Sequence, residues 1–152
     1  MTTRRSRFLP DTSCVVAAVC GWHERHEEAA GEIQRRLDRG DVMLVAGQVL
    51  VEAYSVLTRL PAPHRLSAEA AGTVLDGMAD AGTLTTLDGA ELRSFLSRCV
   101  QNGITGGQTY DAVIATCATA ARADVLLTFN ARHFPQVLAV DLRVVVPGER
   151  TA

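Results

Sequence analysis

The sequence contains no lysine, and all 15 of its basic residues are arginine. With 17 acidic residues the formal net charge is -2, which excludes a strongly basic protein that binds nucleic acid regardless of sequence. Local groups of arginine are still able to grip phosphate, because the planar guanidinium group matches its geometry. Any binding of nucleic acid must therefore depend on local surface patches.

Long apolar runs and paired cysteines are also lacking. No apolar stretch approaches the roughly 20 residues of a membrane-spanning helix, and the basic segment 1–9 is followed by Pro10 and Asp11 rather than by a signal-peptide core. The absence of any C-x-x-C pair favours reduced core thiols over zinc ligands or disulfides. We therefore expect a cytoplasmic protein with no membrane segment. The cysteines in question are Cys14, Cys20, Cys99 and Cys117.

Short apolar runs alternate with helical patterns along the whole chain. A capping-box pattern at Asp88 and Glu91 marks one helix start. Such alternation predicts an α/β fold, a three-layer α/β/α sandwich with a central, mainly parallel sheet, in one domain over residues 1–152. The expected strands lie near 7–10, 41–46, 83–87, 124–129 and 142–147, and the expected helices near 11–19, 23–40, 47–60, 67–82, 88–103 and 110–121.

The position of each acidic residue relative to the strands sorts the candidate functional acids. Ligands of an open parallel sheet bind beyond the carboxyl ends of its strands. Asp11 directly follows the first expected strand and should lie on that rim. Asp124 precedes its strand and should lie at the opposite end, so it is a poor catalytic candidate despite its place near other motifs.

Two further carboxylates stand in apolar helices. Glu52 shares a helical stripe with Val49 and Val56, and Asp111 lies one turn before Ile114 in a helix without other charges. A buried, unpaired carboxylate costs several kcal/mol or stays protonated, so each residue calls for a positive partner.

Separate structural explanations exist for each acid. Asp11 could cap the first helix, Asp111 could be a favourable first-turn anion in a helix capped by Thr109, and Glu52 could pair with Arg59 or Arg98. The coincidence of three such acids favours a shared cation instead. Magnesium or manganese fits better than zinc, because oxygen ligands suit hard cations and no His or Cys accompanies the acids.

Four segments together resemble the PIN-domain ribonucleases, specifically the VapC-type toxins of type II toxin–antitoxin pairs. They are "FLPDTSCVVAAV", "VLVEAYSVLTRLP", "GGQTYDAVIATCA" and "DVLLTFNARHF". The resemblance implies an Mg²⁺- or Mn²⁺-dependent endoribonuclease that leaves a 5'-phosphate and a 3'-hydroxyl. It also implies that Asp11, Glu52 and Asp111 are the catalytic, metal-binding acids.

The chain departs from the family pattern after the last catalytic strand, where members commonly carry a fourth acid. Here Asn130 occupies that region, and His133 stands where many relatives have aspartate. An asparagine removes one negative charge, which weakens the case for a second metal ion. Thr128 is either an auxiliary residue that binds water or phosphate, or an ordinary strand threonine.

The resemblance also implies partners. RNA near an acidic site needs positive charge, for which Arg59 and Arg132 are candidates along with Arg4, Arg5 and Arg7, although solvated surface arginine is the alternative. A VapB-type antitoxin would bind a groove between the first helices, and the toxin would form a homodimer. Interface candidates, or otherwise plain core residues, are Val15, Val16, Trp22, Leu50, Tyr54 and Leu57.

Other functions remain open at this point. Asn130 makes a catalytically inactive PIN-fold RNA-binding module conceivable. A phosphatase of the haloacid dehalogenase type would need a second acid where "DTS" has none, and a receiver domain would need a lysine. His23 and His26 could chelate a metal in principle, but a polar helix face is the simpler interpretation.

Overall fold

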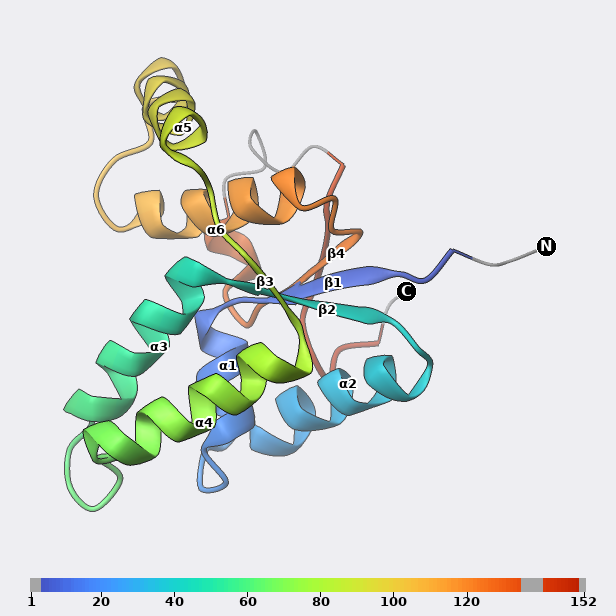
Figure 1. Ribbon diagram of the computed structural model, residues 1–152, viewed down its shortest axis with the longest axis vertical. Helices are drawn as coiled ribbons and strands as arrows, with labels where there is room; N and C mark the ends of the chain where they lie inside the picture. Colours follow the sequence, from blue (N-terminus) through green and yellow to red (C-terminus); the bar gives the residue numbers. More distant parts are fainter. Residues whose placement is uncertain (1–3, 135–140, 151–152) are drawn as a thin grey trace.

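The computed structural model describes residues 4–134 and 141–150 and contains a central parallel sheet (Figure 1). In the described ranges the strands lie in the order β3-β2-β1-β4-β5, and every neighbouring pair is parallel. The predicted parallel α/β sheet is confirmed. The strands are β1 (Arg7–Pro10), β2 (Val42–Ala46), β3 (Thr83–Thr85), β4 (Val125–Leu127) and β5 (Arg143–Val145).

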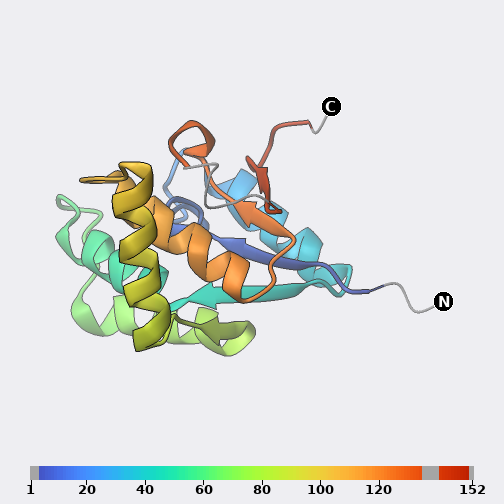
Figure 2. The same ribbon diagram turned by 90° about the horizontal axis from the view of Figure 1, so that it is seen from above.

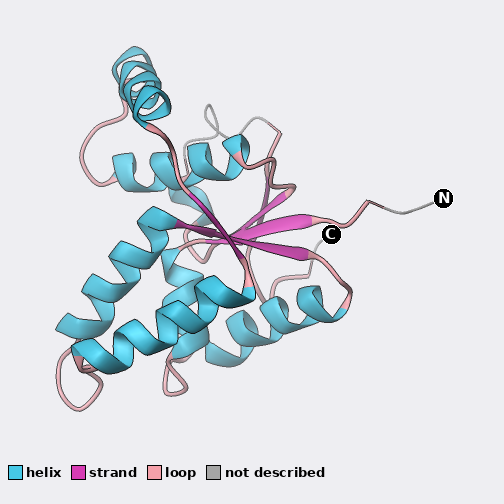
Figure 3. Ribbon diagram, viewed as in Figure 1, coloured by secondary structure: helices cyan, strands magenta, loops and turns pink. Residues whose placement is uncertain are grey.

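Helices cover both faces of this sheet, which confirms the three-layer arrangement (Figures 1 and 3). Helices α1 to α4 lie on one face and α5 and α6 on the other, as the turned view in Figure 2 also shows. The helices are α1 (Thr12–Val19), α2 (His26–Asp38), α3 (Gly47–Arg59), α4 (Ala68–Ala81), α5 (Gly89–Asn102) and α6 (Gln108–Ala120), with a short 3-10 helix η1 (Ala131–His133). The single-domain expectation also includes residues 1–3, 135–140 and 151–152, which lie outside the described ranges.

The strand sequences explain why helices pack on both faces of the sheet. Successive strand residues point to opposite faces, so a run of apolar residues supplies both cores. Phe8 and Met43 pack with Cys14 of α1 and Ile33 of α2. Their sequence neighbours Leu9 and Leu44 pack with the apolar face of α6, within the 112–118 segment. Continuous apolar strands are therefore required by burial on both sides.

Side-chain caps mark where three of the helices in the described ranges begin. Asp11 caps α1, Ser67 caps α4, and Asp88 with Glu91 forms the predicted capping box of α5. The expected Thr109 cap is wrong, because α6 begins at Gln108 after Gly107 and no side chain caps it. Thr109 is therefore inside the helix.

The helix expected over 23–40 begins later, at His26. A turn occupies the preceding residues, in which the His26 N–H donates to the carbonyl of His23 over 2.9 Å. The Nδ1 atom of His23 accepts the backbone N–H of Arg25 over 3.0 Å. The His23 side chain thus accepts a backbone hydrogen bond of this turn, and the helix starts only after it.

The end of the sheet opposite Asp11 is held by an ion pair and a backbone contact. Asp124 accepts the N–H of Arg7 over 2.8 Å and the guanidinium of Arg4 over 2.6 Å. Arg7 also donates to the carbonyl of Ala121 over 3.1 Å. Asp124 is therefore a structural acid, and Arg4, Arg5 and Arg7 lie at the amino end of β1, away from Asp11.

No helix in the described ranges is long and apolar enough to cross a membrane. The four cysteines are free and buried in the core. Thiols in that position pack as small apolar side chains.

Candidate active site

Asp11 is a buried carboxylate at the carboxyl end of β1. Its side chain is almost fully buried, with 2% of the residue exposed. The carboxylate oxygen Oδ1 accepts the hydroxyl of Ser13 over 2.6 Å and the N–H of Cys14 over 3.0 Å. Burial raises the pKa of Asp11 above its usual 3.8, while hydrogen bonds from Ser13, Thr128 and Cys14 act to lower it. A positive charge beside such a carboxyl group would stabilise its charged form.

The end of β4 is joined to the same residues. The N–H of Asp11 donates to the carbonyl of Leu127 over 2.9 Å. Ser13 is a second link, because its hydroxyl accepts the N–H of Phe129 over 3.1 Å. The role of Ser13 in joining α1 to β4 is not visible in the sequence, because it depends on the pairing of β1 with β4.

Thr128 and Asn130 differ in their access to solvent. Thr128 is fully buried, and its hydroxyl accepts the N–H of Asn130 over 2.9 Å. The Thr128 side chain is thus directed at Asp11, whose pKa it helps to lower, and not at a ligand arriving from solvent. Asn130 is exposed and borders a cavity shared with Thr12 and Ser13.

Glu52 lies on α3 and is half-buried. Its Oε2 atom accepts the hydroxyl of Thr12 over 2.9 Å, while Oε1 is buried and has no hydrogen-bond partner among the described residues. Across the described chain Glu52 forms no ion pair with Arg59 or Arg98, so that alternative is wrong. Burial, and then the charge of Asp111, raise the pKa of Glu52.

Asp111 stands in the first turn of α6 and is also half-buried. Burial raises its pKa, and the negative charge of Asp11 raises it further, whereas His133 acts to lower it. Asp11, Glu52 and Asp111 therefore influence one another from α6 and the starts of α1 and α3. The structure brings the three predicted acids to one edge of the sheet.

Two carboxylates, rather than a cluster of three, are the candidate ligands for a metal ion at this site. Within the described ranges no group of three or more His, Cys, Asp or Glu side chains is close enough to hold a metal ion. Mg²⁺ commonly keeps several waters and binds through only one or two carboxylates. Asp11 and Asp111 supply two, and the buried Oε1 of Glu52 has no hydrogen-bond partner among the described residues. The oxygen donor set fits a hydrated hard cation.

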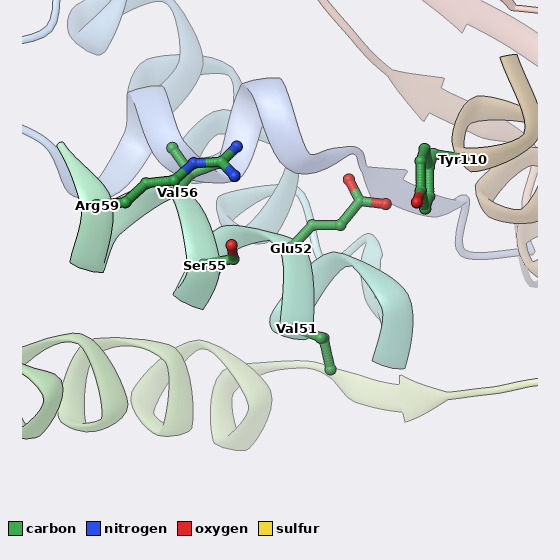
Figure 4. Close-up of a pocket in the computed structure, with 6 residues that line it drawn as sticks. All are labelled: Val51, Glu52, Ser55, Val56, Arg59 and Tyr110. Carbon is green, nitrogen blue, oxygen red and sulfur yellow. The ribbon is translucent and has the colours of Figure 1, made fainter. Parts of the chain in front are cut away.

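Two cavities flank the acids. One of about 380 Å³ is lined by residues of α3 and by Tyr110 (Figure 4). The other, of about 410 Å³, is lined among others by Thr12, His23, Arg25 and Asn130. The site is thus the middle of a longer open surface.

The two arginine candidates occupy different places. Arg59 lines the α3 cavity that also contains Glu52. Arg132 and His133 are exposed on η1 and line a separate cavity of about 270 Å³ with Asn130. Positive charge is therefore available on both sides of the acids.

The histidine pair of "HERH" has structural contacts. The Nδ1 atom of His26 lies 2.9 Å from the carbonyl of Ala17, and that of His23 accepts a backbone N–H. The Nδ1 atoms of both rings are therefore engaged with the backbone.

The predicted interface residues divide into two groups. Val15, Val16 and Leu57 belong to the core, and Leu50 is partly buried and packs against it, so these four are ordinary core residues. Trp22 and Tyr54 are exposed over 47% and 41% of their surface. Only the latter pair is available to a partner.

Comparison with known proteins identifies the family. The family model for the PIN domain matches residues 8–138. The chain belongs to the PIN-domain family. It is 43% identical over 119 residues to Ribonuclease VapC40 of Mycobacterium tuberculosis, covering 78% of this chain and 84% of that protein. This PIN domain is therefore of the VapC type, which rules out the phosphatase and receiver alternatives.

Solved structures share the fold at low sequence identity. VapBC2 from Rickettsia felis, bound to a DNA fragment from its promoter, gives a TM-score of 0.64 at 16% identity, covering 93% of this chain and 98% of that one. VapC20 of Mycobacterium tuberculosis, a Sarcin-Ricin loop cleaving toxin, gives 0.62 at 17% identity, with 83% and 92% covered. These neighbours support the architecture of the PIN domain.

The raised pKa of Asp11 predicts a pH-dependent loss of stability. Between the unfolded value near 3.8 and the higher folded value, the folded state holds a proton that the unfolded state has lost. The contribution of Asp11 to the free energy of unfolding is therefore greatest at low pH and falls as pH rises through that interval. Asp11→Asn removes this loss while keeping an N-cap oxygen. Each pKa unit is worth about 1.4 kcal/mol, or roughly 3–5 °C in Tm.

Thermal melts in chelator from pH 4 to 8 measure the effect. The Tm of the Asp11→Asn variant should rise above that of the unaltered chain as pH increases. Asp76→Asn, on an exposed position of α4, is the matched control and should follow the unaltered chain. Parallel curves for Asp11→Asn and the unaltered chain would show that Asp11 carries no burial penalty.

Proposed function

We propose that this PIN domain is the toxin of a VapBC-type pair and an endoribonuclease that depends on Mg²⁺ or Mn²⁺. The observation that carries the proposal is the meeting of Asp11, Glu52 and Asp111 at one sheet edge, where burial raises the pKa of each and neighbouring negative charge adds to the effect at Glu52 and Asp111. Similarity to a protein named as a ribonuclease supports RNA as the substrate.

Each acid has a distinct role in this proposal. Asp11 and Asp111 hold the cation, which when bound lowers the pKa of a water and polarises the phosphate. Glu52 accepts a proton from the attacking water through Oε1, while the Thr12 hydroxyl fixes Oε2. The raised pKa of Glu52 makes it a better base than an exposed glutamate. Ser13 and Thr128 orient Asp11.

Arg59 and Arg132 provide positive charge for the RNA backbone. Both are exposed: Arg59 lines the cavity that contains Glu52, and Arg132 lines a cavity with Asn130 and His133. Guanidinium groups bind phosphate in a planar, two-point manner, which suits a chain without lysine. The acids alone would repel RNA.

Charge removal at the metal-binding acids tests the activity. Asp11→Asn and Asp111→Asn should each reduce Mn²⁺-dependent cleavage of structured RNA by about 100-fold or more. Asp76→Asn makes the same chemical change on an exposed face of α4 and should retain full cleavage. The assay follows RNA fragments on a denaturing gel, with and without chelator. Cleavage by the Asp11 or Asp111 variants at the rate of the unaltered chain refutes these roles.

A second candidate function is a PIN fold that binds RNA without cutting it. The exposed Asn130 favours it, since an amide stands where an acid would add negative charge for a second metal. In the same assay this alternative predicts no cleavage by the unaltered chain in Mn²⁺, together with RNA binding that persists in chelator.

The proposal includes two protein partners and a cytoplasmic location. The solved VapBC2 pair supports a VapB-type antitoxin, for which exposed Trp22 and Tyr54 are contact candidates. Buried free thiols agree with a reducing compartment. A homodimer is supported by an exposed apolar stripe on α5, a helix that stands out from the body of the molecule in Figure 1. The stripe comprises Leu92, Leu96 and Val100, exposed over 38%, 57% and 83% of their surface.

Charges on this stripe test the homodimer. The residues are four positions apart and share one helical face, so the double change Leu96→Glu with Val100→Glu should convert a dimer into a monomer. Sedimentation velocity measures the mass. Val74→Glu, at an exposed apolar position of α4, should leave the dimer intact. A monomeric unaltered chain, or a dimer that survives the double change, contradicts this interface.

A further inference from the structure

An exposed aromatic side chain stands directly beside a candidate metal ligand. Tyr110 precedes Asp111 in the first turn of α6 and is exposed over 62% of its surface. In the described ranges its hydroxyl has no hydrogen-bond partner, and its ring pairs with no other aromatic ring. The fold gains little from this ring, so its presence needs another explanation.

Tyr110 closes a cavity whose opposite wall is one face of α3. One side of α3 carries the residues that line this wall, because Ser55 and Val56 lie three and four positions after Glu52 and four and three positions before Arg59. Figure 4 shows the Glu52 carboxylate directed toward Tyr110, with Arg59 farther along the same face. The cavity thus runs from an aromatic ring, past a catalytic candidate, to a guanidinium group.

This sequence of groups matches the parts of one nucleotide. An aromatic face stacks on a nucleobase, and a guanidinium group binds a phosphate. The Ser55 hydroxyl and the Val56 side chain offer polar and apolar contact between them. The volume of about 380 Å³ falls in the range of about 300–1,000 Å³ that is typical of ligand pockets.

We propose that this cavity holds an unpaired nucleotide of the RNA next to the cleaved phosphate, with Tyr110 stacked on its base and Arg59 on a flanking phosphate. The inference rests on the proposed ribonuclease function and makes it specific. Tyr110 becomes a residue that selects single-stranded RNA, because a paired base is already stacked in its helix and offers no free face. Stacking on a ring tolerates every base, so the cavity selects strand state rather than sequence.

Direct binding tests this role without depending on cleavage. Each change is made in the Asp11→Asn background, and the probe is a fluorescein-labelled, random-sequence single-stranded RNA followed by anisotropy. Tyr110→Ala should weaken binding about 5- to 150-fold, the equivalent of roughly 1–3 kcal/mol for one stacked base. Tyr110→Phe retains the ring and should bind within twofold of the background. Tyr54→Ala, an exposed tyrosine outside the cavity, is the matched control.

A duplex form of the same RNA provides the second readout. Tyr110→Ala should not change its affinity, whereas Arg59→Gln should weaken both forms and reduce the slope of log affinity against log salt by about 1. Equal affinity of the Tyr110→Ala and background proteins for single strands overturns the inference. So does an equal loss on duplex, or a loss confined to binding of a protein partner. Absence of cleavage by the unaltered chain would refute the proposed function alone, since these binding results stand apart from it.

Discussion

The burial of three carboxyl groups at one edge of the sheet is the constraint on which the rest of this PIN domain depends. Asp11 is almost completely buried, and Asp111 and Glu52 are half-buried. Burial raises the pKa of each, and neighbouring negative charge adds to the effect at Asp111 and Glu52. A fold would avoid such an arrangement if its only purpose were stability. The proposed cation would offset the cost of burial, because a positive charge beside the acids favours their charged form.

The parallel sheet is what makes the convergence possible. The chain order reverses between β1 and β4, and ligand sites of open α/β sheets lie at such reversals. Asp11 leaves β1 at this point and is tied to β4 by its N–H and by the Ser13 hydroxyl. Helices α3 and α6 then direct Glu52 and Asp111 at the same edge. A central core with apolar strand residues on both faces keeps these helix starts in place.

Strand position predicted the places of two acids in the fold from sequence alone. Asp11 follows a strand and Asp124 precedes one, and the structure places them at opposite ends of the sheet. The partner of Glu52 could not be predicted, because the Thr12 hydroxyl comes from another helix and meets it only after packing. The cap expected at Thr109 is wrong for a local reason, since α6 begins at Gln108 and Gly107 occupies the cap position. The exposure of Tyr110 is likewise set by the tertiary arrangement of α3 and α6 and leaves no mark in the sequence pattern.

The central claim is that Asp11 and Asp111 share a divalent ion while Glu52 lies beside it. Crystals grown with Mn²⁺ and measured near the manganese absorption edge locate the ion directly by anomalous scattering. The account predicts an anomalous peak between Asp11 and Asp111, about 2.0–2.3 Å from an oxygen of each, and its loss in the Asp111→Asn variant. Manganese bound only elsewhere on the protein, or no peak at the sheet edge at saturating Mn²⁺, would contradict it.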